Sequence, residues 1–127
     1  MMILIDTSIW IRAFAQRQPF AAEAAKLIRE GKAVAHELVY GELLMGDIGG
    51  RGQFLRDYER MPQAKPVPHL DVVVLVRGRH LQGRGVGWID VQLLASALAR
   101  RMRLWTADPR LATMAEELGV DYRLAGA

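Results

Sequence analysis

The chain has no cysteine among its 127 residues. This absence excludes a disulfide framework and a thiolate metal site, and it makes a reducing compartment, the cytoplasm, the expected location. No apolar run approaches the roughly 20 residues that a membrane-spanning helix needs. The apolar start at residues 1–5 is too short for a signal peptide and ends at Asp6. We therefore expect no membrane association.

Internal repeats, low-complexity tracts and linker-like segments are also missing. With 51% hydrophobic and 24% charged residues, the composition is globular, and we expect residues 1–127 to form a single domain. Lysine is scarce, so arginine supplies most of the positive charge behind the net charge of +3. Arginine forms bidentate contacts with phosphate. This composition fits a nucleic-acid partner and fits a plain solvated surface equally well.

Short apolar runs alternate with amphipathic segments along the chain. The apolar runs predict strands at 2–5, 33–35, 104–106 and 120–123, with a brief extended piece at 65–67 and a turn at Gly49 and Gly50. Helical spacing and start or stop signals predict helices at 7–15, 19–30, 36–45, 53–61, 70–81, 90–102 and 109–118. Strands that alternate with helices predict an α/β fold with a parallel sheet covered on both faces.

Four acidic residues lie where apolar structure should exclude them. Asp6 and Asp108 follow predicted strands, Glu42 interrupts an apolar helix, and Asp90 opens another. Carboxylates are rarely buried unless they are paired or bind a metal. In open α/β sheets, sites form beyond the carboxyl ends of the strands. The four acids together predict an oxygen-ligand site for a hard cation such as Mg²⁺, of the kind that catalyses phosphoryl chemistry.

Taken singly, three of these acids have an ordinary explanation. Asp6, Asp90 and Asp108 each precede or open a predicted helix, where an acidic side chain caps the free N–H groups. For any one of them, helix capping is the better interpretation. Glu42 lies in mid-helix and has no capping role. The set is therefore more specific than its members.

Hydroxyl side chains accompany the acids, at Thr7, Ser8 and Thr106. They are candidates to orient the carboxylates around a metal. Hydrogen bonding within local turns is the alternative interpretation.

The other polar motifs are weaker. His36 and Glu37 begin like a zinc-protease helix, but Tyr40 stands where the second histidine belongs. His69 and His80 have no partner at ligand spacing, so all three histidines are interpreted as surface or structural residues. The glycine-rich loop at 83–88 lacks the final glycine of a dinucleotide-binding loop.

The order of the acidic motifs resembles that of a known family. The first two motifs of PIN-domain ribonucleases are similar to residues 5–11 (IDTSIWI) and 41–46 (GELLMG). The third is similar to residues 88–97 (WIDVQLLASA), and the fourth to residues 104–111 (LWTADPRL). In size and motif order the chain most resembles the VapC toxins of bacterial type II toxin–antitoxin pairs.

This resemblance implies a three-layer α/β/α fold with a central parallel sheet, and it favours a helix at 70–81. It implies Mg²⁺ or Mn²⁺ held by Asp6, Glu42, Asp90 and Asp108, with hydrolysis of RNA phosphodiester bonds. It also implies a homodimer and a cognate antitoxin protein that occupies the active-site groove.

Two alternatives remain open from the residues. The first is an aspartate-based phosphatase or receiver-like domain, which also places an aspartate after the first strand. Such a phosphatase needs a second aspartate where Ser8 stands, and a receiver needs a lysine that does not follow Val120. The second is a non-catalytic α/β binding module, which would tolerate neutralisation of the four acids.

Overall fold

The apolar run near the N-terminus forms the central strand of a parallel sheet. Strand β1 (Ile3–Ile5) is fully buried and pairs in parallel with β2 (Ala33–His36) on one side and β4 (Arg103–Trp105) on the other. Strand β3 (Gln63–Ala64) pairs in parallel with β2, which gives the order β3-β2-β1-β4. The prediction of a central, apolar, parallel first strand is confirmed.

A computed structural model describes residues 1–46 and 52–124 of the chain, and the turn predicted at Gly49 and Gly50 lies outside these residues. The described residues form seven helices: α1 (Thr7–Phe14), α2 (Phe20–Arg29), α3 (Glu37–Met45), α4 (Gly52–Glu59), α5 (His69–Arg79), α6 (Trp88–Arg100) and α7 (Pro109–Glu117). The ambiguous segment at 70–81 is thus a helix, as predicted. None of these seven has the length and apolar character to cross a membrane.

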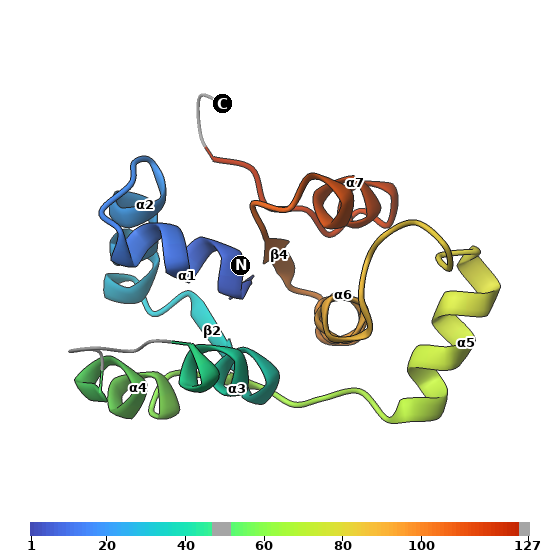
Figure 1. Cartoon of the computed structure of the whole chain (residues 1–127), viewed down its shortest axis with the longest axis horizontal. Helices are drawn as coiled ribbons and strands as arrows, with labels where there is room; N and C mark the ends of the chain where they lie inside the picture. Colours follow the sequence, from blue (N-terminus) through green and yellow to red (C-terminus); the bar gives the residue numbers. More distant parts are fainter. Residues whose placement is uncertain (47–51, 125–127) are drawn as a thin grey trace.

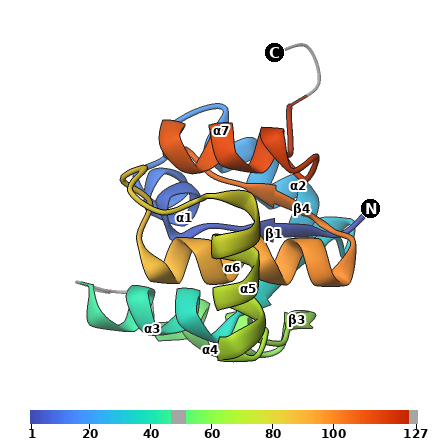
Figure 2. The same ribbon diagram turned by 90° about the vertical axis from the view of Figure 1, so that its right-hand side faces the viewer.

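The helices cover both faces of the sheet in three layers. Figure 1 shows α1 and α2 on one side of the strands and α6 on the other, with α5 outside α6. Turned by 90°, the molecule presents α5 and α6 in front of the strands (Figure 2). The predicted three-layer α/β/α architecture is confirmed.

An aromatic cluster attaches α4 to α1 beside the sheet. The rings of Trp10 and Phe54 lie 5.1 Å apart, and those of Phe14 and Phe54 lie 4.8 Å apart in an edge-to-face arrangement. Tyr58 packs edge-on against Trp10 at 5.9 Å and is almost completely buried. These contacts place α4, and the strand β3 that follows it, at the β2 edge of the sheet.

Two expected strands differ from the sequence prediction. The segment at 120–123 forms only one parallel bridge, between Leu104 and Asp121, because Tyr122 turns inward to contact Trp105 and to donate a hydrogen bond to Glu23. The extended piece predicted at 65–67 pairs two residues earlier, as β3. The prolines that flank Val67 lack the N–H donors that a ladder needs.

Candidate active site

Asp6 connects the end of β1 to the start of α1. Its backbone N–H donates to the carbonyl of Trp105 at 2.9 Å, which joins the carboxyl ends of β1 and β4. The side chain is only 4% exposed and makes no capping bond to α1, so the capping interpretation is wrong for this residue. Instead, Oδ2 accepts hydrogen bonds from the hydroxyls of Ser8 and Thr106, each at 2.7 Å. The buried carboxylate is therefore held in one orientation by two donors.

The same two hydroxyls connect Asp6 to the segment that carries Asp108. Ser8 Oγ accepts the N–H of Ala107 at 3.0 Å, and Thr106 Oγ1 accepts the N–H of Asp108 at 3.1 Å. The turn after β4 is thus built around the hydroxyls that bind Asp6. Local turn bonding and carboxylate orientation, which the sequence left as alternatives, are both present.

Glu42 reaches the site from the middle of α3. Its Oε1 accepts a hydrogen bond from Thr7 Oγ1 at 2.6 Å, and Thr7 is the residue that follows Asp6. Both side chains are part-buried. The contact brings a carboxylate from α3 to the beginning of α1, at the carboxyl end of the sheet.

Asp90 lies in the first turn of α6 and does not cap it. The helix begins at Trp88 with Gly87 at the N-cap position, so the capping interpretation is wrong for Asp90 as well. Burial, together with the nearby negative charges of Asp6, Glu42 and Asp108, raises the pKa of the Asp90 carboxyl to about 6. The charges of three carboxylates from other segments of the chain therefore reach Asp90.

Asp108 does cap its helix. Its Oδ1 accepts the N–H of Arg110 at 2.9 Å, and Pro109 occupies the first position of α7. The capping interpretation is correct here. The cap occupies one carboxylate oxygen, and the charge of Asp108 still reaches Asp90.

The donor chemistry of the four side chains fits a hard divalent cation. Carboxylate oxygens are the preferred ligands of Mg²⁺ and Mn²⁺. Burial and the charges of the other three acids raise the pKa of Asp90, and a bound cation would counter both effects. In residues 1–46 and 52–124, however, no three acidic, histidine or cysteine side chains are gathered closely enough to form a ready-made metal cage. The charges of the other three carboxylates nevertheless reach Asp90.

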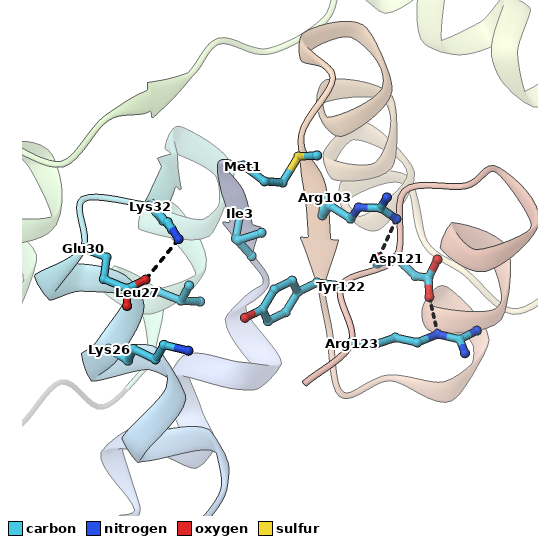
Figure 3. Close-up of a pocket in the computed structure, with 10 residues that line it drawn as sticks. All are labelled: Met1, Ile3, Lys26, Leu27, Glu30, Lys32, Arg103, Asp121, Tyr122 and Arg123. Carbon is cyan, nitrogen blue, oxygen red and sulfur yellow. Dashed lines mark hydrogen bonds and ion pairs between the residues drawn. The ribbon is translucent and has the colours of Figure 1, made fainter. Parts of the chain in front are cut away.

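The opposite end of the sheet has a different character. A cavity of about 520 Å³ lies at the amino ends of β1 and β4, between α2 and the segment after α7 (Figure 3). Its charges are mixed and mostly paired: Lys32 lies 3.2 Å from Glu30, and Arg123 lies 2.7 Å from Asp121. Unpaired negative charge is therefore concentrated at the carboxyl ends of the strands and not at their amino ends.

The sequence analysis missed a buried polar network beside the acids. His36 is completely buried, and its Nδ1 accepts the N–H of Leu38 at 3.1 Å, so the ring caps α3. Its Nε2 lies 3.1 Å from Ser96 Oγ, which donates to the carbonyl of Gln92 at 2.9 Å. The amide of Gln92 makes two further hydrogen bonds to the backbone of Val67, at 2.8 and 2.9 Å.

This network joins α3 and α6, the two helices that carry Glu42 and Asp90. Burial lowers the pKa of His36, because the charged ring would lose its hydration. The interpretation of His36 as structural is confirmed. One signal was available in the sequence: Gln92 and Ser96 interrupt the apolar face of a helix at a spacing of four residues.

The fold and the site together define an α/β domain with a parallel sheet and an acidic site at its carboxyl end. The model of the PIN domain family matches residues 3–117. The chain is 40% identical over 120 residues to proteins named Ribonuclease VapC32 from two strains of Mycobacterium tuberculosis, CDC 1551 / Oshkosh and H37Rv, with 94% of each chain covered. The chain therefore belongs to the PIN domain family, as a VapC-type member.

A solved structure shows the same fold at greater distance. The PAE2754 protein of Pyrobaculum aerophilum superimposes with a TM-score of 0.59 at 18% identity, covering 93% of this chain and 92% of that one. This likeness supports the three-layer α/β/α fold, and the family match over residues 3–117 confirms the predicted resemblance to PIN-domain proteins.

Proposed function

We propose that this protein is a Mg²⁺- or Mn²⁺-dependent endoribonuclease and the toxin of a type II toxin–antitoxin pair. The observation that carries the proposal is the electrostatic coupling of Asp6, Glu42, Asp90 and Asp108 at the carboxyl end of the sheet. Family membership and the 40% identity to proteins named ribonucleases support RNA as the substrate and favour this hypothesis over a phosphatase or receiver domain.

The four carboxylates would hold the cation, which when bound supplies Lewis-acid stabilisation of the charge that develops on a phosphodiester. The remaining roles belong to hydroxyls of the chain. Ser8 and Thr106 fix the rotamer of Asp6, so that its second oxygen, Oδ1, stays directed away from them. Thr7 does the same for Glu42. Positioned ligands reduce the reorganisation that accompanies the reaction.

The partners follow from the same arrangement. A cluster of four carboxylates attracts a positively charged side chain, which suits an arginine or lysine of an antitoxin segment. We further propose that residues 1–127 form one domain, that the chain forms a homodimer, and that it acts in the cytoplasm. The VapC-type family membership is the support for these statements.

Cleavage of RNA by the purified protein tests the proposal. With total RNA and Mg²⁺, we expect discrete new ends that can be mapped, no cleavage in EDTA, and recovery when Mg²⁺ or Mn²⁺ is added back. Asp6→Asn removes one ligand charge with little change of shape, so we expect at least a roughly 100-fold loss of rate, because even supporting residues of metal sites contribute 10–100-fold.

Circular dichroism and thermal melting should show that Asp6→Asn stays folded. If Asp6→Asn and Asp90→Asn both cleave at the parent rate in Mg²⁺, the proposed site is wrong. Intact RNA and normal growth on expression of the chain alone would contradict the toxin assignment.

A further inference from the structure

A small cavity lies beside the first turns of α7, next to Asp108 in the chain. It has a volume of about 270 Å³ and is lined by Arg84, Pro109, Arg110 and Thr113. Three of these residues belong to the first two turns of α7, immediately after Asp108. Arg84 belongs to the loop between α5 and α6, which leads to Asp90. The cavity thus lies between the two segments that carry Asp108 and Asp90.

The figures show this juxtaposition. In both views the loop after α5 runs beside α7 before it enters α6 (Figures 1 and 2). The cavity is therefore at the rim of the acidic site, on the side formed by α7 and this loop, and it is distinct from the larger cavity at the amino ends of the strands.

Gly85 allows the Arg110 side chain to lie against the backbone of that loop. A Cβ atom at position 85 would be 2.6 Å from Nη1, 3.0 Å from Cδ and 3.1 Å from Cζ of Arg110. Gly85 also has a φ of +80°, a conformation that other residues adopt only with strain. The absence of a side chain at this position is therefore what gives the guanidinium its place in the cavity wall.

The two arginines differ in their partners. Arg84 binds both carboxylate oxygens of Glu117, so its charge is compensated. The Arg110 guanidinium makes no hydrogen bond or ion pair with a carboxylate in residues 1–46 and 52–124, and only its backbone N–H is used, in the cap of Asp108. The guanidinium of Arg110, with its planar array of N–H donors, is therefore free to bind one anionic group.

We propose that this cavity binds a backbone phosphate of the RNA strand and that Arg110 is the residue that contacts it. The proposal rests on the proposed function, because it assigns a subsite to the same RNA-cleaving site. Four carboxylates repel a polyanion, so a strand needs fixed positive charge next to them to stay in register. Arg110 follows Asp108 by two residues and supplies that charge at the shortest distance along the chain.

Binding of single-stranded RNA tests the proposal without cleavage. In the Asp6→Asn background, a fluorescent oligoribonucleotide should bind about tenfold more weakly when Arg110→Ala is added. The slope of log K against log salt should also fall by about 0.7, the value for one lost phosphate contact on a single strand. The RNA affinity of Arg110→Lys should lie between that of the Asp6→Asn protein and that of Arg110→Ala, because lysine keeps the charge and loses the bidentate geometry. Arg29→Ala is the matched control, since Arg29 is an exposed arginine near the end of α2.

Gly85→Ala tests the geometry independently. It leaves every charge in place and displaces the guanidinium, so it should weaken RNA binding in the direction of Arg110→Ala, with little further effect when the two are combined. If Gly85→Ala fails to fold, as judged by thermal melting, the Arg110 series alone decides.

The results distinguish a wrong phosphate subsite from a wrong proposed function. An Arg110→Ala affinity and salt slope equal to those of Arg29→Ala would overturn the subsite. Loss of binding to inorganic phosphate alone, with unchanged RNA affinity, would also overturn it, since the site would then serve a free anion. Weaker RNA binding by Arg110→Ala, in a chain whose unmutated form leaves RNA intact in Mg²⁺, would support the subsite and contradict the proposed function.

Discussion

Two polar clusters draw residues from the same two helices, α3 and α6, and their chemistry is opposite. The buried network of His36, Ser96 and Gln92 is neutral, and each of its groups has a hydrogen-bond partner. The acidic site contains four carboxylates, and the pKa of Asp90 is raised there by burial and by the negative charges of the other three. A satisfied neutral network stabilises and specifies a fold, whereas clustered like charges destabilise it. The neutral network of His36, Ser96 and Gln92 therefore serves the structure, whereas the four acids serve the chemistry.

The two clusters also respond to pH with opposite signs. His36 has a lowered pKa in the folded chain, so the unfolded chain binds a proton first as the pH falls below the ordinary value of 6.5. Stability that depends on neutral His36 is therefore lost towards acid pH. Asp90 has a raised pKa, so the folded chain keeps its proton longer as the pH rises. Its contribution to stability is therefore lost towards neutral pH.

The largest expected difference between the clusters is in activity, and a matched pair of serines measures it. Ser8 donates to Asp6, and Ser96 bonds with His36 and Gln92. Ser8→Ala should slow RNA cleavage by about 10–100-fold, the usual effect of removing a group that orients a metal ligand. Ser96→Ala should change the rate far less once the protein is folded. Steady-state cleavage of one oligoribonucleotide by both variants, at a temperature where both are folded, provides the comparison.

The free energy of unfolding should rank the two variants in the opposite order, with the larger loss in Ser96→Ala and the smaller in Ser8→Ala. Ser96→Ala leaves His36 Nε2 without its buried partner, while Gln92 keeps its two hydrogen bonds to Val67, so the variant should lower the free energy of unfolding by about 1–3 kcal/mol. Ser8→Ala should cost less, because Ser8 is only part-buried, so that water can replace its hydroxyl, and Asp6 keeps the hydrogen bond from Thr106. Urea unfolding in EDTA gives both values. Equal losses of stability and equal losses of rate in the two variants would show that the clusters are not functionally distinct.

A smaller effect is expected from Asp90→Asn in the metal-free protein. Between the ordinary pKa of 3.8 and the folded value of about 6, the folded chain retains a proton that the unfolded chain has released. The parent should therefore become less stable as the pH rises from about 4 to about 6, and this contribution should then level off. Because Asp90 is partly exposed, we expect a discounted effect of about 1–2 kcal/mol, which Asp90→Asn should abolish.

Urea unfolding in EDTA at pH 4.5 and 7.5 measures this change. Asp71→Asn is the control, because Asp71 is an exposed acid in the first turn of α5, the position that Asp90 has in α6. If Asp90→Asn and Asp71→Asn have the same stability profile against pH, the carboxylates do not interact as described.

The sequence predicted most of the fold, because the strongest signals are local. The apolar runs identified the strands β1, β2 and β4, and the helical spacing identified all seven helices of the described residues, with ends displaced by at most two residues. The last strand was predicted wrongly at 120–123, since the inward turn of Tyr122 depends on contacts with α2 and β4. Such contacts between distant segments leave no local pattern.

The four acids of the site were predicted from the sequence, whereas the residues that hold them in place were predicted only in part. Hydroxyls adjacent to acids suggested the roles of Thr7, Ser8 and Thr106, and the structure adds which carboxylate each one binds. The His36–Ser96 contact spans 60 residues, and the approach of Arg110 to Gly85 joins the first turn of α7 to the loop before α6. Neither has a sequence signature, because each depends on how α6 and α7 pack.

The central claim is that Asp6, Glu42, Asp90 and Asp108 act as one cation site. Calorimetric titration of Mn²⁺ into the parent protein and into the four single amide variants, Asp6→Asn, Glu42→Gln, Asp90→Asn and Asp108→Asn, tests it most directly. We expect each variant to bind Mn²⁺ at least about tenfold more weakly than the parent, while Asp71→Asn binds as the parent does. Parent-like Mn²⁺ affinity in two or more of the four folded variants would contradict a shared site.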